Sequence, residues 1–193
     1  MASRLGLFNS CQPLGISVPA PSRFDITGIR ADMTIPSRCE ITFGRLPDIP
    51  PDEIIAHMSD PRLAEHMPLL TSEWDSRKLA DFVAAKEECW RRDRLGHWAI
   101  LCNDIYVGWG GFQKEGDEWD FGLVLKPDYF GLGARIANKA IAFATADERI
   151  PFVTFLLPLS RRHLGALARL GAEFLGEVAY DGAQFRKYRL DTQ

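Results

Sequence analysis

The sequence lacks a long apolar run, and it lacks the spacing of cysteines that marks a metal site. A membrane-spanning helix needs about 20 consecutive apolar residues, and nothing in the 193 residues approaches that length. The N-terminal stretch also has no apolar core followed by a small-residue cleavage site, which a secretory signal would need. These absences predict a cytoplasmic protein without a membrane partner.

The cysteines are few and scattered. Cys11, Cys39, Cys89 and Cys102 form no CxxC pair and have no histidine at ligand spacing, so we expect no metal site. We interpret all four as reduced thiols.

The sequence also lacks a large excess of charge of either sign. The formal net charge is −3, and acidic residues stand among the arginines at 91–94. A nucleic-acid-binding domain needs a basic face, so we expect no nucleic-acid partner. Hydrophobic residues make up 46% and charged residues 25% of the chain, which is typical of one globular domain.

Periodicity locates that domain in the larger C-terminal part of the chain. Residues 1–35 mix Gly, Pro, Ser and isolated apolar residues without a period, so we interpret them as an N-terminal extension and place the domain at 36–193. Asn103-Asp104 and Asp181-Gly182 are strong signals for tight hairpin turns. The patterns predict strands at 40–43, 97–101, 105–112, 119–125, 152–157, 174–180 and 184–190, and helices from Asp52 and at 76–93, 133–148 and 161–170, the last capped by Ser160.

A glycine loop connects the strand at 119–125 to the helix at 133–148. Gly131-Leu132-Gly133 lets the backbone approach a ligand closely, and the first amides of the helix point at negative charge. A pyrophosphate would suit this site, whereas the alternative is a simple tight turn. Ala134-Arg135 does not fit a P-loop, and the preceding antiparallel meander does not fit a dinucleotide fold.

The segment 120–133, which reads Asp-Phe-Gly-Leu-Val-Leu-Lys-Pro-Asp-Tyr-Phe-Gly-Leu-Gly, resembles the acetyl-CoA motif of the GNAT superfamily of N-acetyltransferases. It is most similar to the branch of ribosomal-protein N-terminal acetyltransferases, as are Arg169-Leu170-Gly171-Ala172 and Tyr180-Asp181-Gly182. The resemblance covers 38–192 in element order, sharply at 118–135 and 160–190. It implies an α/β (α+β) fold: a mixed, mostly antiparallel sheet of six to seven strands, with helices on both faces and a splayed central strand pair.

The resemblance also implies acetyl-CoA as co-substrate and assigns its contacts. Pantetheine would pair with the strand backbone at Leu123, Val124 and Leu125. The acidic Asp128 should point to solvent, because it would repel a phosphate. The pyrophosphate would rest on the amides of Phe130, Gly131, Leu132, Gly133, Ala134 and Arg135, with Arg135 adding its charge or else standing as a solvated helix residue.

Amide formation needs a base that takes a proton from the amine. Asp120 lies where this branch commonly has Glu, and we favour it over Glu118, although both could be ordinary strand-edge charges. The amide of Val124 could stabilise the thioester oxygen. Ser160 replaces the family's usual Asn, and the helix tyrosine that usually protonates the thiolate is absent. This leaves Ser160, His163, Tyr188 or water as the acid.

Aromatic residues could line the acceptor site or only fill the core: His66, Trp74, His97, Trp109 and Trp119. Our leading hypothesis is an N-acetyltransferase that acts on a primary amine, either a protein N-terminus or a small molecule, by direct attack in a ternary complex. The alternatives are a non-catalytic CoA-binding module and an interaction domain whose glycine loop is only a turn. The C-terminal hairpin could serve a homodimer.

Overall fold

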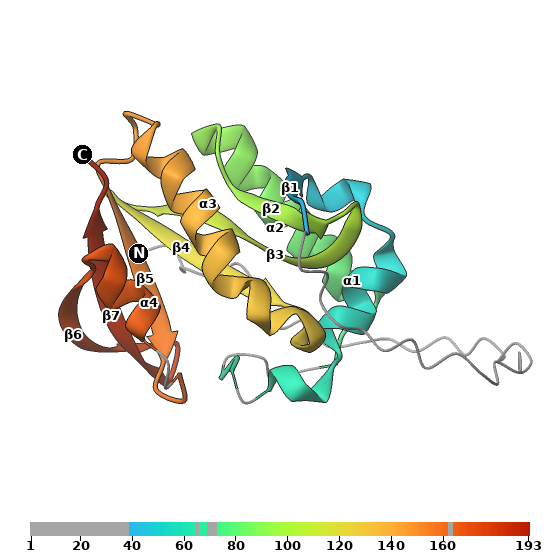
Figure 1. Cartoon of the computed structure of the whole chain (residues 1–193). Helices are drawn as coiled ribbons and strands as arrows, with labels where there is room; N and C mark the ends of the chain where they lie inside the picture. Colours follow the sequence, from blue (N-terminus) through green and yellow to red (C-terminus); the bar gives the residue numbers. More distant parts are fainter. Residues whose placement is uncertain (1–38, 65, 69–72, 162–163) are drawn as a thin grey trace, which may run out of the picture.

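The computed structural model describes residues 39–64, 66–68, 73–161 and 164–193 (Figure 1). The predicted extension at 1–35 lies outside them. The strands are β1 (Ile41–Gly44), β2 (His97–Cys102), β3 (Ile105–Glu115), β4 (Glu118–Leu125), β5 (Phe152–Pro158), β6 (Glu173–Tyr180) and β7 (Ala183–Asp191). The α-helices are α1 (Pro51–Met58), α2 (Ser76–Asp93), α3 (Gly133–Thr145) and α4 (Gly165–Leu170), and short 3-10 turns lie at η1 (Leu46–Asp48), η2 (Pro61–Leu63) and η3 (Pro127–Leu132).

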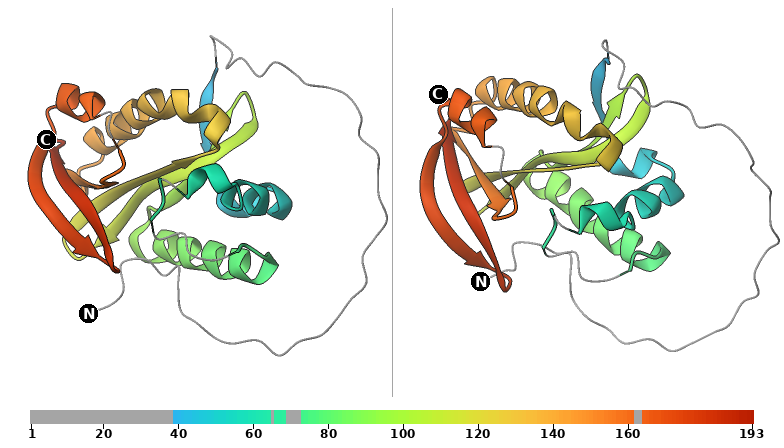
Figure 2. Two further views of the ribbon diagram at one scale, coloured as in Figure 1. Left: turned by 90° about the horizontal axis from the view of Figure 1, so that it is seen from below. Right: turned by 60° about the horizontal axis from the view of Figure 1, so that its bottom comes forward.

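The strands form one sheet in the order β1-β2-β3-β4-β5-β7-β6. Every neighbouring pair is antiparallel except β4 and β5, which are parallel. Helices α1 and α2 cover one face of the sheet, and α3 and α4 cover the other (Figure 2). This architecture confirms the predicted fold class.

Two of the hairpins turn where the sequence predicts. Asn103 and Asp104 both adopt positive φ angles, 50° and 64°, and Asp181 and Gly182 do so at 46° and 81°. Left-handed backbone at both central positions suits the twist of the flanking strands, which explains the preference for Asn, Asp and Gly there. The sequence thus fixes the register at both turns.

Strand β3 runs three residues further than predicted, to Glu115, and it is rich in glycine for a steric reason. A Cβ atom at Gly108 would lie 2.3 Å from the carbonyl oxygen of Val124, and one at Gly110 would lie 2.5 Å from that of Gly122. Side chains cannot be accommodated at such distances, so these glycines allow β3 and β4 to approach closely.

Helix α4 differs from the prediction in its start. It begins at Gly165 after Leu164, so Ser160 does not cap it; residues 162 and 163 lie outside the described part of the chain. The six-residue helix ends at Leu170, and Gly171 after it has a φ of 81°, as the sequence predicts.

The structure corrects the interpretation of two cysteines. Cys39 and Cys102 form a disulfide with their Cα atoms 5.4 Å apart, whereas Cys89 is a free, buried thiol. Sequence spacing did not reveal the pair because the two residues are 63 positions apart and meet only when β1 pairs with β2.

Within the described ranges, no helix is long and apolar enough to cross a membrane. The same residues contain no cluster of three or more His, Cys, Asp or Glu side chains suited to a metal ion.

Candidate functional site

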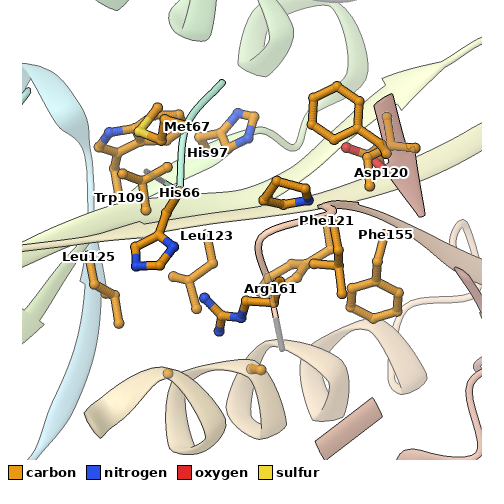
Figure 3. A pocket seen from close by; sticks show the side chains of 18 of the residues that line it. His66, Met67, His97, Trp109, Asp120, Phe121, Leu123, Leu125, Phe155 and Arg161 are labelled. Carbon is orange, nitrogen blue, oxygen red and sulfur yellow. The ribbon is translucent and has the colours of Figure 1, made fainter. Parts of the chain in front are cut away.

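The sheet opens between its two parallel strands. β4 and β5 pair only at Trp119 with Val153 and at Asp120 with Thr154, although both strands continue for several residues. A cavity of about 720 Å³ occupies this opening and reaches both faces of the sheet. In Figure 3, Leu123 and Leu125 lie toward α3, whereas His97 and Trp109 lie on the other side of β4. The opening therefore connects two chambers across the strand.

The chamber on the α3 side ends at the start of that helix. Gly133 and Ala134, the first two helical residues, line the cavity, and no described side chain caps the helix. A Cβ atom at Gly133 would meet only Leu125, at 3.9 Å, so packing within the protein does not require glycine there. The Gly133 amide already donates to the Phe130 carbonyl, so the amides after it, together with the helix dipole, make this end a site for an anion.

The residues assigned to the cofactor divide into two groups. Gly131 is exposed, Leu132 is buried in the core, and neither contributes to the cavity wall, nor does Arg135. The cavity is lined by Leu123, Val124, Leu125, Phe130, Gly133 and Ala134.

The two charged residues of this loop are engaged elsewhere. The Arg135 guanidinium donates to the backbone carbonyl of Cys39 at 2.6 Å, so its side chain ties α3 to the chain before β1. Asp128 forms an exposed ion pair with Arg62 at 2.7 Å. Asp128 is exposed, in line with the expectation that it points to solvent, and Arg62 neutralises its charge.

Arg161 is a cation that the sequence analysis did not single out. It follows β5, is exposed and lines the cavity, and its guanidinium lies on the α3 side of β4 (Figure 3). It can supply the positive charge that Arg135 does not. Sequence pattern offered no signal for this placement, which depends on the divergence of β5 from β4.

Backbone alternation decides which amides of β4 face the opening. The amide of Lys126 donates to the Val107 carbonyl on β3 at 2.8 Å. In an antiparallel ladder such bonds recur at every second residue, so the polar groups of Val124 face β3 and those of Leu123 and Leu125 face the gap. The expectation that Val124 provides an amide for the thioester oxygen is therefore wrong, although its side chain lines the cavity.

Asp120 lies at the last paired position of β4, directly before the strands separate. Its carboxylate is half-buried, accepts a hydrogen bond from the Thr154 hydroxyl at 3.2 Å and lines the cavity. Glu118 instead forms an ion pair with Lys187 at 2.7 Å and is not part of the cavity wall. The structure thus brings Asp120, rather than Glu118, to the opening.

The candidates for the acid also separate. Ser160 lines the cavity from the turn after β5, whereas Tyr188 packs against Phe174 with ring centroids 5.2 Å apart and lies outside the cavity wall. His163 lies outside the described residues. Tyr180, at the end of β6, also lines the cavity; the sequence marked it only as the start of a turn.

The second chamber lies between β4 and the helices α1 and α2. His66, Trp74, His97 and Trp109 line it together with apolar residues that include Met58 and Met67. Trp119 does not; it is buried in the core cluster on the opposite face of the sheet with Phe121 and Phe155. Successive side chains of a strand point to opposite faces of the sheet, so Trp119 points away from the face on which its neighbour Asp120 lies.

Two nitrogen-bearing side chains are deeply buried in this chamber. Lys86 of α2 is 3% exposed and donates to the Gln113 side-chain carbonyl at 3.0 Å. Burial lowers the pKa of Lys86 to about 8. Burial, aided by the charge of Lys86, holds the pKa of His97 well below its usual value, so this imidazole is neutral. Lys86 was missed, yet the sequence held a signal: it lies on the buried stripe of α2 with Leu79, Phe82 and Cys89.

We expect the substitution Lys86→Met to stabilise the fold at neutral pH. Since burial lowers the pKa from 10.5 to about 8, the native state holds a buried charge below pH 8. Between the two values the unfolded chain still binds that proton while the native protein does not, so stability rises with pH there. The gain from Met should be as much as about 3 kcal/mol below pH 8 and vanish near pH 10.5.

Urea denaturation of both proteins at several pH values between 7 and 10.5 measures this difference. The comparison cancels the titrating groups that do not interact with Lys86, because the two proteins share them. A gain that does not change with pH would show that Lys86 retains an ordinary pKa in the native state.

Solved structures share this fold. An acetyltransferase of the GNAT family from Bacillus anthracis superposes with a TM-score of 0.62 and 14% identity, over 81% of this chain and 96% of the other. A spermidine N-acetyltransferase from Vibrio cholerae in complex with CoA and spermine superposes with a TM-score of 0.62 and 7% identity, over 81% of this chain and 96% of the other. An aminoglycoside acetyltransferase in complex with coenzyme A superposes with a TM-score of 0.60 and 12% identity, over 80% of this chain and 95% of the other.

At the level of sequence, no family model and no curated protein matches the chain. The structural neighbours include GNAT-family acetyltransferases, and the mixed sheet with its splayed β4 and β5 is the GNAT fold.

Proposed function

We propose that this protein is an acetyl-CoA-dependent N-acetyltransferase. One observation carries the proposal: the opening between β4 and β5 leads to the uncapped N-terminus of α3. Such an opening offers backbone groups to an extended chain such as pantetheine, and the helix start binds its pyrophosphate. Two neighbours with this fold are named as acetyltransferases in complex with CoA, which supports the same use here.

The cofactor-binding groups follow from the geometry. The backbone of Leu125 pairs with pantetheine, the start of α3 at Ala134 receives the pyrophosphate, and Arg161 adds a positive charge. Ala137 and Asn138, one turn further along α3, line the same chamber and limit the path of the cofactor.

The chemistry takes place where β4 and β5 begin to separate. Asp120 accepts a proton from the amine, directly or through water, and the neutral amine attacks the thioester carbonyl. The amide of Leu123 faces the gap and donates to the carbonyl oxygen as it becomes negative. The departing thiolate takes a proton from Ser160, Tyr180 or water, because a thiol with a pKa near 8.5 needs no strong acid.

The acceptor is a primary amine that enters through the chamber beside α1 and α2. The sequence motif at 120–133 favours the branch of ribosomal-protein N-terminal acetyltransferases, and the neighbours named for spermidine and aminoglycosides favour small amines. Both kinds of acceptor present a primary amine to the same carboxylate.

Calorimetry with acetyl-CoA, followed by release of CoA thiol with a panel of amines, tests this function. Micromolar binding and amine-dependent thiol release are the expected results. Binding without turnover of any amine would leave a CoA-binding module, as the loss of the usual Asn at Ser160 would allow. No binding at all would remove the acyltransferase proposal.

A further inference from the structure

The acceptor chamber contains hydrogen-bond donors that lack acceptors. An ammonium group has three N–H donors and an indole has one, and neither accepts. Among the described residues, Lys86 has one hydrogen-bond acceptor, the Gln113 side chain, and the buried indole nitrogen of Trp74 has none. Lys86 is 3% exposed and Trp74 is 6% exposed, so water at the surface does not satisfy them.

Both donors border the same part of the cavity. Each lines the cavity wall, and each contacts the ring of Phe82. The Trp74 ring centroid lies 5.3 Å from the Phe82 ring centroid, and the Lys86 nitrogen lies 5.7 Å from it. A buried cation and a buried neutral donor are complemented by a group with several lone pairs and negative charge. A carboxylate has both properties, whereas a second amine has neither.

This donor cluster, Lys86 with Trp74, lies next to the proposed base. Gln113, which holds Lys86, is directly opposite Asp120 in the pairing of β3 with β4. The amide of Gln113 also donates to Glu115 at 2.5 Å, which turns its carbonyl oxygen toward Lys86. The Lys86 ammonium and the Asp120 carboxylate are therefore held at adjacent positions on one wall of the chamber.

We propose, building on the acetyltransferase function above, that the acceptor is a small amine with a carboxylate close to its nitrogen, as in an amino acid. Asp120 receives the amine, and Lys86 and Trp74 donate to the carboxylate. The remaining wall includes Met58, Met67 and Trp109, which suits an apolar side chain on the acceptor. Polyamines are disfavoured because they would bring a second positive charge to Lys86.

Matched pairs of acceptors that differ only in the carboxylate provide the test. We would measure kcat/KM for methionine against 3-(methylthio)propylamine, and for phenylalanine against phenethylamine. The wild type should prefer the amino acid by roughly tenfold or more, as expected for a charge-assisted hydrogen bond in a buried site. In Lys86→Met this preference should fall to about one.

Arg77→Met is the control, because it removes a cation from an exposed position of the same helix outside the cavity and should leave the preference intact. Equal use of both members of each pair by the wild type would overturn this proposal and leave the acetyltransferase function standing. A preference that survives in Lys86→Met would also overturn it. Failure to acetylate any amine, despite binding of acetyl-CoA, would remove the function and the acceptor class together.

Discussion

The substitution Gly133→Val should strongly weaken the binding of acetyl-CoA while leaving the fold intact. The residue begins α3 with helical φ and ψ angles of −52° and −45°, which valine can adopt. A Cβ at this position would meet only Leu125, at an ordinary 3.9 Å, so the new side chain extends into the cavity. There it would occupy the place of the pyrophosphate and separate it from the first amides of the helix.

Loss of one or two charge-assisted hydrogen bonds should raise the dissociation constant by roughly 10- to 1000-fold. Calorimetry measures the binding, and thermal denaturation reports on the fold. Ser76→Val is the matched control, since Ser76 is the first residue of α2, is exposed and lies away from the cavity. Unchanged affinity in Gly133→Val would place the cofactor elsewhere.

Asp120→Asn should reduce kcat by roughly 10²- to 10⁴-fold, the range typical of general-base catalysis. Asparagine keeps the size of the side chain and an oxygen for the Thr154 hydroxyl, which now lies 3.2 Å from the carboxylate. Binding of acetyl-CoA should therefore persist.

Asp117→Asn makes the same chemical change at an exposed position in the turn before β4, and its activity should match the wild type. Initial rates of thiol release at saturating acetyl-CoA compare the three proteins. A kcat within about threefold of the wild type in Asp120→Asn would assign the base to another group, because a catalytic base contributes far more than that.

Much of the fold is encoded locally. The apolar period of α2 predicted the helix at 76–93, the bounds that the structure has, and Asp75 caps its start. Asn103-Asp104 and Asp181-Gly182 predicted their turns because few residues tolerate left-handed backbone. The glycine loop before α3 could be recognised in the same way, since a strand, two glycines and a helix start are all short-range features.

The candidate site was only partly predictable. Asp120 could be named from the motif, but its advantage over Glu118 rests on Lys187, which reaches Glu118 from β7. Whether the Val124 amide faces β3 or the gap depends on which alternate residues of β4 are hydrogen-bonded to β3. The pattern of side chains in the sequence does not reveal this. Lys86 lies in the apolar stripe of its helix, but its role could not be predicted from that position. Only the packing of the helix against the sheet shows what the buried ammonium faces.

The sequence by itself determined the order of the elements, two hairpin turns and the loop at the start of α3. These depend on backbone preferences and hydrophobic periods that act over a few residues. Only the tertiary structure decided that Arg135 binds the Cys39 carbonyl, that Arg161 lines the cavity and that Cys39 meets Cys102. Such contacts join residues far apart in the chain, and they are set by how the strands pair and diverge, which no local pattern records.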